Sequence, residues 1–311
     1  MMLLLLLLCL LPSASASWLG WCDKLPQRGW PSCDELQPLA ARARDVVARI
    51  STADKIQMLS GGQCCGQASG PAAPSIRLDA YNWWSEITHG LAFETYDTVL
   101  NASSNTALPI TTSCAFNRSL WYATGNLLGR EARAYMNRGL VGSTFWSPVV
   151  NIVRDPRWGR NIEVAGEDPL VSAEYAVAYV QGMQTATETG YPLQASACCK
   201  HFVANELERW NGTTRKLFDA SVPARDLVDS YLPSFEACVT RGKASGIMCS
   251  YNSVNGVPSC ANSWLLKDLL RGAWGFGARA RFHSAAFLPP SRALSRARCP
   301  PARPTPQTPT R

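Results

Sequence analysis

From about residue 142 onward, short apolar runs alternate with longer stretches in which apolar residues recur at helical spacing. Three runs have the length of a buried strand: 145–153, 194–202 and 246–251. Three stretches have the spacing of a helix: 169–187, 227–239 and the residues that follow Asn262. Strands that alternate with helices are typical of βα units, whose strands pair in parallel. The pattern therefore predicts an α/β fold built on a parallel sheet.

Repeated βα units form either a closed (β/α)8 barrel or an open nucleotide-binding sheet. Gly-rich phosphate-binding turns mark the open sheet. The sequence contains no GxGxxG motif, no Walker lysine and no GxSxG elbow. We therefore expect a (β/α)8, TIM-barrel-like domain, in which an active site lies at the carboxyl ends of the strands.

Composition divides the chain into three segments. Residues 1–17 hold the apolar run Leu3–Leu11, closed by small residues, which is typical of a signal peptide and too short to cross about 30 Å of hydrocarbon. Residues 18–276 form the predicted barrel domain. Residues 277–311 contain seven arginines without lysine or acidic residues, which accounts for the whole formal charge of +7. This charge pattern predicts an unpacked Arg- and Pro-rich tail and no nucleic-acid-binding groove.

Twelve cysteines indicate an oxidising compartment, in which cysteines pair. Neither Cys64-Cys65 nor Cys198-Cys199 is a CxxC motif, and the three histidines give no Cys2His2 spacing, so no metal site is expected. Three glycosylation sequons begin at Asn101, Asn117 and Asn211. We expect a secreted glycoprotein that has no membrane segment once the signal peptide is cleaved.

Polar side chains follow the predicted strands at their carboxyl ends. The loop 154–160 (RDPRWGR) follows the first strand, Lys200-His201 ends the second, and Tyr251-Asn252 ends the third. Upstream, Trp83-Trp84 stands close to Glu86. Aromatic rings beside charged groups suit a sugar, whose C–H face packs on a ring while its hydroxyls need directional hydrogen bonds. The strand ends are therefore a candidate sugar-binding site.

Each feature also has a purely structural interpretation. Three aromatic residues are as consistent with a core as with a site: Trp83, Trp84 and Tyr251. His201 taken alone would be a core histidine with satisfied hydrogen bonds. The loop 154–160 is also consistent with an ion-pair network, in which one arginine faces a ligand and the others pair with Glu163, Glu167 and Asp168. The sequence leaves these alternatives open.

Four strings carry a family resemblance: YNWWSEITHG, FWSPVVNIVRDPRWGRNIEVAGEDP, ACCKHFVANELERW and ASGIMCSYNSVNGVPSCA. Through them, residues 18–276 resemble the N-terminal barrel domain of glycoside hydrolase family 3, most closely its plant β-D-xylosidase and α-L-arabinofuranosidase branch. The resemblance implies a secreted enzyme of the cell wall, or extracellular matrix. Such an enzyme removes xylose or arabinose from the non-reducing ends of xylan or arabinoxylan oligosaccharides, with retention of configuration and without a cofactor.

The resemblance also implies roles for single residues. The hydroxyls of the terminal sugar would be held by Glu86, Arg160, Lys200 and His201, and Tyr251 would lie next to the catalytic nucleophile. Asn205-Glu206 stands where the family usually carries Tyr-Asp, which puts one sugar-facing position in doubt.

A larger departure follows Phe276. The family continues with a strand that ends in Ser-Asp, whose carboxylate is the nucleophile, whereas this chain reads GARARFHS from Gly277 to Ser284. The nucleophile expected near His283 is absent, and the family takes its acid/base residue from a later region. Retaining hydrolysis needs both carboxyl groups. We therefore expect a barrel that is incomplete at its last strands and a truncated, inactive form of the enzyme.

Three functions remain as hypotheses. The first is a truncated family 3 glycosidase, and the second is a non-catalytic carbohydrate-binding module that keeps part of the sugar pocket. The third is a protein whose basic tail binds acidic polymers, which composition alone supports only weakly.

Overall fold

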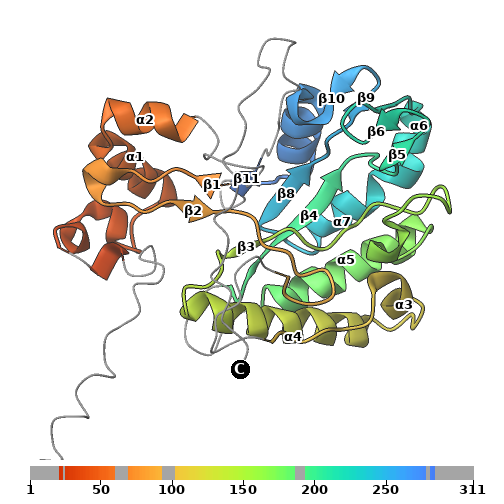
Figure 1. Cartoon of the computed structure of the whole chain (residues 1–311), viewed down its shortest axis with the longest axis horizontal. Coiled ribbons are helices and arrows are strands. Elements are labelled where there is room, and N and C mark those ends of the chain that lie inside the picture. The colour runs from red at the N-terminus through yellow and green to blue at the C-terminus, as the bar shows by residue number, and fades with distance from the viewer. Residues whose placement is uncertain are drawn as a thin grey trace, which may run out of the picture.

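The computed structural model describes residues 21–23, 25–59, 69–92, 102–185, 193–277 and 281–283. The predicted signal peptide lies outside these residues. A four-stranded parallel sheet forms the centre of the fold, in the order β11-β8-β4-β3 (Figure 1). Its strands are β3 (Thr144–Phe145), β4 (Ser196–Phe202), β8 (Gly246–Cys249) and β11 (Arg281–His283). The predicted α/β class with parallel strands is confirmed.

The strand predicted over 145–153 is only partly regular. The ladder of β3 covers Thr144 and Phe145, and the chain rejoins β4 through an isolated parallel bridge between Val149 and Lys200. Pro148 lies between the two paired segments and has no N–H with which to continue a ladder. Its carbonyl still accepts a hydrogen bond from the Lys200 N–H at 3.1 Å. The segment therefore runs beside β4 without being a continuous strand.

Three helices pack together along the sheet: α4 (Arg118–Asn137), α5 (Pro169–Met183) and α7 (Pro233–Thr240) (Figure 1). The start of α5 is fixed by Asp168, whose Oδ1 accepts hydrogen bonds from the N–H groups of Leu170 and Val171 at 2.7 and 2.9 Å. Glycines let α4 and α5 approach closely: a Cβ on Gly125 would collide with the Tyr179 carbonyl, and one on Gly182 with the Tyr122 carbonyl. Close packing of the two backbones thus holds α4, which the sequence pattern did not predict, against the predicted helix α5.

The helix predicted over 227–239 is present but is not a single regular α-helix. The chain forms α6 (Ala224–Asp226), a π-helical turn η6 (Leu227–Tyr231) and then α7. The interruption coincides with Pro233, which lacks an N–H and whose ring is incompatible with the carbonyl four residues earlier in a regular helix. The helix predicted after Asn262 is present as the π-helical η8 (Trp264–Ala273), and the Asn262 side chain accepts a hydrogen bond from the Leu265 N–H at 3.1 Å.

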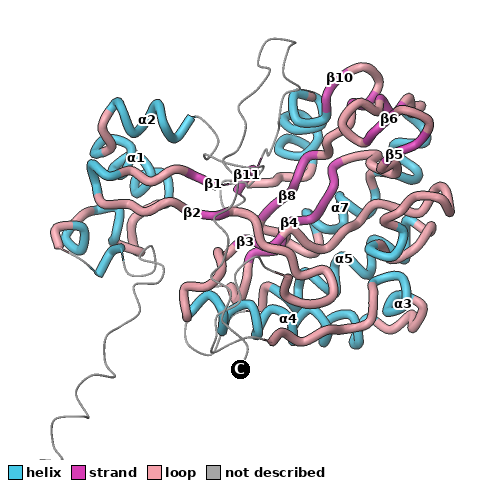
Figure 2. The backbone as a smooth tube through the Cα atoms, in the orientation of Figure 1, coloured by secondary structure: helices cyan, strands magenta, loops and turns pink. Residues whose placement is uncertain are grey.

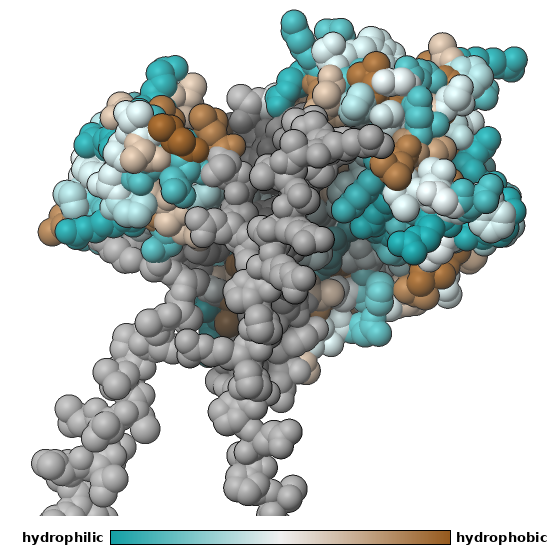
Figure 3. All heavy atoms as spheres, turned by 45° about the horizontal axis from the view of Figure 1, so that its top comes forward, coloured by the Kyte–Doolittle hydropathy of each residue, from teal (hydrophilic) through white to brown (hydrophobic). Residues whose placement is uncertain are grey.

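The N-terminal residues form a separate lobe with its own small core around Trp21, Ile50 and Ile76. This lobe holds α1 (Leu39–Arg49) and α2 (Thr52–Leu59), and Figure 3 shows hydrophobic residues on its surface. The pair β1 (Ser69–Gly70) and β2 (Tyr81–Asn82) connects it to the sheet domain (Figure 1).

The remaining elements are short and lie mostly in the loops that surround the strand ends (Figure 2). They are α3 (Pro109–Ser113), β5 (Arg209–Trp210), β6 (Thr213–Thr214), β7 (Asp219–Ala220), β9 (Ser253–Val254) and β10 (Val257–Pro258). Six 3-10 turns complete the described chain: η1 (Trp21–Asp23), η2 (Gln27–Gly29), η3 (Pro31–Cys33), η4 (Pro74–Ile76), η5 (Asn161–Glu163) and η7 (Ser259–Ala261).

The four-stranded sheet does not close into a barrel within the described residues. Residues 277–311 were expected to be unpacked, but residues 281–283 form β11, in parallel register with residues 246–248 of β8. For these three residues the expectation is wrong, because their backbone donors and acceptors complete a ladder that β8 would otherwise leave open. Residues 284–311 lie outside the described chain.

Disulfides join three pairs of cysteines: Cys22–Cys33, Cys199–Cys238 and Cys249–Cys260. The second pair ties β4 to α7, across the interface between the sheet and its helices. Cys114 and Cys198 are the free cysteines of the described chain, and Cys64-Cys65 lies outside it. The expectation of oxidised pairs is thus confirmed for six cysteines. Within the described ranges, no helix combines the length and the apolar character that crossing a membrane requires.

Candidate active site

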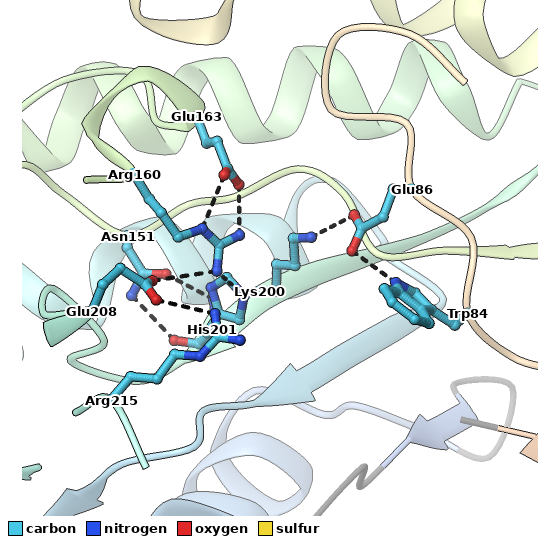
Figure 4. Close-up of polar contacts among 9 residues, drawn as sticks. All are labelled: Trp84, Glu86, Asn151, Arg160, Glu163, Lys200, His201, Glu208 and Arg215. Carbon is cyan, nitrogen blue, oxygen red and sulfur yellow. Dashed lines mark hydrogen bonds and ion pairs between the residues drawn. The ribbon is translucent and has the colours of Figure 1, made fainter. Parts of the chain in front are cut away.

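Polar side chains from four separate segments meet at the carboxyl ends of β3, β4 and β8 (Figure 4). Glu86 follows β2, Arg160 lies in the loop after β3, and Lys200 and His201 belong to the end of β4. We call these four residues, with Trp84, Glu163, Glu208, Arg215 and Tyr251, the polar cluster. The five residues singled out from the sequence all belong to it.

Lys200 and Glu86 form a buried ion pair in the cluster. The Lys200 Nζ lies 2.5 Å from Oε2 of Glu86, and the lysine side chain is only 3% exposed. Oε1 of the same carboxylate accepts a hydrogen bond from the Trp84 indole N–H at 3.1 Å. A charge this deeply buried is tolerated only when it is paired. The carboxylate therefore holds both the ammonium group and the indole in place.

Arg160 connects this region to His201. It donates from Nε and Nη2 to the two oxygens of Glu163, at 2.9 and 2.6 Å, and its Nη1 lies 3.2 Å from Nε2 of His201. Because arginine can only donate, Nε2 is the accepting nitrogen and the imidazole proton sits on Nδ1. Burial lowers the pKa of His201 well below its usual value, and the positive charges of Arg160 and Lys200 act in the same direction. The ring is therefore neutral at physiological pH.

Glu163 remains a carboxylate in this pair. Burial by itself would raise the pKa of Glu163, but the hydrogen bonds and the charge of Arg160 outweigh it and leave the pKa below its usual value. The loop 154–160 thus contributes one ion pair of the predicted network. The predicted pairing with Asp168 is wrong, because that side chain caps α5 instead.

Asn151 holds the backbone of His201 on both sides of the residue. Its Oδ1 accepts from the His201 N–H at 2.8 Å, and its Nδ2 donates to the His201 carbonyl at 3.1 Å. The same Nδ2 donates to Oε1 of Glu206 at 3.1 Å. Burial raises the pKa of Glu206 to about 8, although the hydrogen bond from Asn151 and the charge of Arg154 oppose the shift. Glu206 is therefore mostly protonated at neutral pH.

A third carboxylate, that of Glu208, links the cluster to Tyr251. Glu208 accepts a hydrogen bond from Nη1 of Arg215 at 3.1 Å and lies 3.6 Å from Nη1 of Arg160. The Arg215 guanidinium lies over the Tyr251 ring, 4.7 Å from its centroid. The Tyr251 and His201 rings are 6.4 Å apart. The three carboxylates of the cluster are thus each paired with a cationic side chain.

The aromatic residues differ in how they contact the cluster. Trp84 stacks on Trp146 at 6.2 Å between ring centroids, and its indole N–H also donates a hydrogen bond to Glu86. It therefore belongs both to the packed interior and to the polar cluster. Trp83 makes an edge contact with Tyr81 at 4.4 Å. His89 lies apart from the drawn cluster, and its Nδ1 hydrogen-bonds to the side-chain oxygen of Asn105 at 2.8 Å.

Three members of this arrangement were missed from the sequence: Asn151, Glu208 and Arg215. Asn151 stands in an apolar run, where a lone amide is a signal of a buried hydrogen-bonding role. Nothing in the local pattern distinguishes Glu208 or Arg215 from exposed charges. Asn205, the first of the two residues that stand where the family usually carries Tyr-Asp, is fully buried. Its side-chain amide has no hydrogen-bond partner within the described chain.

Among the described residues, β11 brings His283 and no carboxylate beside the end of β8, with His283 in register with Met248. Ser284 is not among them. The described part of the chain also contains no group of three or more His, Cys, Asp or Glu residues placed to hold a metal ion. The side chains of the polar cluster offer donors and acceptors that can bind and orient polar groups. Each of its three carboxylates is engaged in an ion pair.

Comparison with known proteins relates this arrangement to a family. Residues 83–295 match the glycosyl hydrolase family 3 N terminal domain. Probable β-D-xylosidase 7 of Arabidopsis thaliana is 43% identical over 249 residues, which make up 77% of this chain and 32% of that protein. β-Xylosidase/α-L-arabinofuranosidase 1 of Medicago sativa subsp. varia is 40% identical over 247 residues, or 78% of this chain and 31% of that protein.

Solved structures agree with the sequence matches. A GH3 exo-β-xylosidase in complex with a xylobiose aziridine activity-based probe has a TM-score of 0.75 to this chain at 30% identity, and the match covers 84% of this chain and 33% of that one. The fold is accordingly TIM-barrel-like, as expected from the sequence. The chain spans about a third of the length of the relatives it matches (32% and 31%). The family match extends past Phe276, to residue 295. Because it covers most of the chain, the chain belongs to glycosyl hydrolase family 3 and holds the sequence of its N-terminal domain.

Proposed function

We propose that the polar cluster binds the non-reducing terminal sugar of a xylan-derived oligosaccharide, xylose or arabinose, as the sugar-recognition part of a β-xylosidase-type glycoside hydrolase. The proposal rests on one observation: hydrogen-bonding side chains of fixed orientation lie beside the aromatic ring of Trp84. Lys200 is ion-paired with Glu86, and Arg160 with Glu163. The Trp84 indole N–H donates a hydrogen bond to Glu86. Such preorganised donors and acceptors beside a ring match a small polyhydroxylated ligand.

His201 provides a specific contact for a hydroxyl. Its Nε2 is engaged by Arg160, and its buried Nδ1 has no hydrogen-bond partner within the described chain. Since the ring is neutral, Nδ1 carries a proton and can donate it in a hydrogen bond. A buried donor without a partner costs about 1–3 kcal/mol. Because Nδ1 is shielded from solvent in this structure, a sugar hydroxyl would reach it only after a neighbouring side chain moves, and accepting this hydrogen bond would then remove the cost.

We further propose that this chain recognises the sugar without cleaving it. Retaining hydrolysis needs a nucleophile and an acid/base carboxyl group about 5–5.5 Å apart. The family resemblance places the nucleophile at the end of the strand that β11 occupies, where this chain has His283-Ser284. The three carboxylates of the polar cluster are already neutralised by Lys200, Arg160 and Arg215. Binding without hydrolysis is also what the alternative of a carbohydrate-binding module requires.

The binding proposal is tested by titrating xylose and xylobiose into the protein by isothermal calorimetry. We expect dissociation constants of about 1 mM, because a few hydrogen bonds of about 0.5–3 kcal/mol each must offset the entropy of association. Lys200→Ala should abolish binding, and Lys267→Ala, at an exposed lysine of η8, should leave it unchanged. Equal signals from both variants would show that the polar cluster does not bind the sugar.

We also propose that the protein is secreted into the extracellular matrix or cell wall and is glycosylated. The three disulfides support an oxidising compartment. Asn117 and Asn211 are exposed, the first as the N-cap of α4 and the second at the tip of the β5–β6 hairpin, whereas Asn101 lies outside the described residues. Enzymatic removal of N-glycans from the protein secreted by plant cells should lower its apparent mass, and the Asn117→Gln/Asn211→Gln variant should show a smaller change.

A further inference from the structure

One glycosylation sequon lies in the turn of the β5–β6 hairpin, at the periphery of the fold (Figure 1). The sequon Asn211-Gly212-Thr213 begins directly after Trp210, and Trp210 pairs with Thr213 across the hairpin. Asn211 and Gly212 form the turn with φ angles of 44° and 81°, which these two residues adopt readily in tight hairpins. The acceptor asparagine is therefore exposed on a short, well-defined element.

The aromatic ring next to this asparagine is unusually exposed. Trp210 is 56% exposed, although burial of a tryptophan contributes strongly to stability. The Arg157 guanidinium lies 4.5 Å from the ring centroid, and its Nε and Nη2 donate to the two oxygens of Asp155 at 2.9 and 2.6 Å. Arg157 thus covers one face of the indole. More than half of the tryptophan remains available for another contact.

The register of the hairpin places Trp210 and Thr213 on one face. Side chains of residues directly opposite each other in an antiparallel pair lie on the same side and close together. Asn211 stands between them in the sequence, and its amide linkage to a glycan is short. The first N-acetylglucosamine of a glycan on Asn211 therefore stays within reach of both side chains.

The hairpin begins and ends at the polar cluster. Glu208 precedes β5 and Arg215 follows β6. The Arg215 N–H donates to the Glu208 carbonyl at 2.8 Å, and its Nη1 donates to the Glu208 carboxylate at 3.1 Å. A two-stranded hairpin with two residues in each strand is marginally stable by itself. A contact that stabilises the tip therefore also helps to hold Glu208 and Arg215 in place.

We propose that a glycan on Asn211 packs its first N-acetylglucosamine against the Trp210 ring and the Thr213 methyl group, and thereby stabilises the β5–β6 hairpin beside the polar cluster. This inference rests on the proposed glycosylation of Asn211. The bond forms when Nδ2 displaces the diphosphate group of a lipid-linked oligosaccharide from C1 of this sugar and gives up one proton. The C–H face of the sugar then removes apolar indole surface from water. Because the sugar is covalently attached, no loss of translational freedom opposes the contact.

The test uses the full chain secreted by plant cells that make only oligomannose glycans. All proteins carry Asn101→Gln and Ser119→Ala, which leave Asn211 as the only sequon; Ser119→Ala keeps the Asn117 cap of α4. Mass spectrometry first measures whether Asn211 is glycosylated. Endoglycosidase H then leaves one N-acetylglucosamine on Asn211, whereas peptide N-glycosidase removes the whole glycan and leaves an aspartate, which also suits the turn.

Hydrogen–deuterium exchange of residues 210–215 measures how often the hairpin opens in each form. We expect the form with one N-acetylglucosamine to exchange at least about threefold more slowly than the sugar-free form, which corresponds to about 0.7 kcal/mol. Trp210→Val keeps a β-branched partner for Thr213 but lacks the ring, so its two forms should exchange at equal rates. Trp210→Phe should retain most of the difference. Trp264→Val, at a similarly exposed tryptophan of η8, is the matched control and should retain all of it.

A difference that persists unchanged in Trp210→Val overturns the inference, because the glycan then acts without the ring. Equal exchange of the two forms of the parent also overturns it, as does an unmodified Asn211 in the secreted protein. None of these outcomes affects the proposed sugar binding by the polar cluster, since the measurement uses no ligand. Failure of the protein to reach the medium overturns the proposed secretion together with this inference.

Discussion

Lys200 is the most deeply buried charge of the polar cluster, and Glu86 is its ionic partner. The lysine side chain is 3% exposed and the glutamate 28%. Removing one member of such a pair leaves the other buried and uncompensated, which costs more than the pair itself contributes. The Lys200–Glu86 ion pair therefore contributes both to the stability of the fold and to the geometry of the polar cluster.

We predict that Glu86→Gln lowers the free energy of unfolding by about 3 kcal/mol, because Lys200 then remains as an unpaired buried charge. Urea denaturation followed by circular dichroism measures the change. Asp229→Asn, which removes the exposed carboxylate that pairs with Arg225, is the control and should cost about 1 kcal/mol or less. The double variant Glu86→Gln/Lys200→Met should recover part of the loss. If the double variant is less stable than Glu86→Gln alone, the buried charge is not the cause.

Glu206 gives the fold a distinct dependence on pH. Its pKa rises from 4.5 to about 8 on folding, so the folded state binds more protons than the unfolded state between these values. Its contribution to stability is therefore complete below about pH 4.5 and is lost as the pH rises towards 8. His201 has the opposite sign, since its folded pKa is lowered and its contribution is lost as the pH falls below about 6.5.

We predict that Glu206→Gln makes the protein more stable at pH 8 than the parent and removes a slope of up to about 1.4 kcal/mol per pH unit between pH 6.5 and 8. Gln keeps an oxygen that accepts the hydrogen bond from Asn151. Urea unfolding at pH 5, 6.5 and 8 measures the effect, with Glu236→Gln on the exposed face of α7 as the control. Parallel pH profiles for the parent and Glu206→Gln would contradict the elevated pKa.

At the scale of elements, the contact between α4 and α5 depends on glycine. Alanine normally favours a helix over glycine by about 1 kcal/mol. At Gly182, however, a Cβ would overlap the Tyr122 carbonyl of the facing helix. The opposing atoms belong to backbone and cannot rotate away. At Gly182 the cost of this steric overlap therefore outweighs the gain in helix propensity that alanine would bring.

We predict that Gly182→Ala lowers the free energy of unfolding by about 2–3 kcal/mol, the cost of overpacking less the gain in helix propensity. Gly272→Ala in η8 is the matched control, since its Cβ would meet only the Lys267 carbonyl at an ordinary 3.5 Å. That variant should be neutral or slightly stabilising. Thermal unfolding of the two variants distinguishes the effects, and equal midpoints would show that the helices can separate without cost.

At the scale of the whole molecule, the proposal that this chain does not hydrolyse its ligand depends on which residues the sheet brings to the end of β11. The described sheet has four parallel strands, and its last strand contains Arg281, Phe282 and His283. The polar cluster is assembled from the loops of the other strands. Under the proposed function, the groups that bind the sugar therefore lie on other strands than the one at whose end the family resemblance implies the nucleophile.

We predict that the purified chain does not hydrolyse 4-nitrophenyl β-xyloside or the corresponding arabinoside above background. Loss of a nucleophile from a cooperative catalytic set removes nearly all of the rate enhancement. Release of nitrophenol over several hours measures the activity, and the Glu86→Ala variant controls for contaminating enzymes. Turnover by the parent that disappears in Glu86→Ala would mean that this chain itself hydrolyses the glycoside and would contradict the prediction.

Local patterns in the sequence were sufficient for much of the fold. The alternation of apolar runs and helical spacing predicted β4, β8, α5 and the helix after Asn262, because burial periodicity and capping act over a few residues. The same pattern placed Arg160, Lys200, His201 and Tyr251 at or just after strand ends, where parallel strands bring them together, and the family resemblance added Glu86. Their roles in sugar binding remain predictions that the proposed experiments test.

The tertiary structure decided which side chains meet. Glu208 and Arg215 are ordinary charges in the sequence, and they enter the cluster because the β5–β6 hairpin folds back over the end of β4. Asn151 clamps His201 from a position 50 residues earlier. The strand character of residues 281–283 likewise depends on β8 and not on their own apolar content. Periodicity is a local property and can be found in sequence, whereas partner choice between distant segments depends on the path of the whole chain.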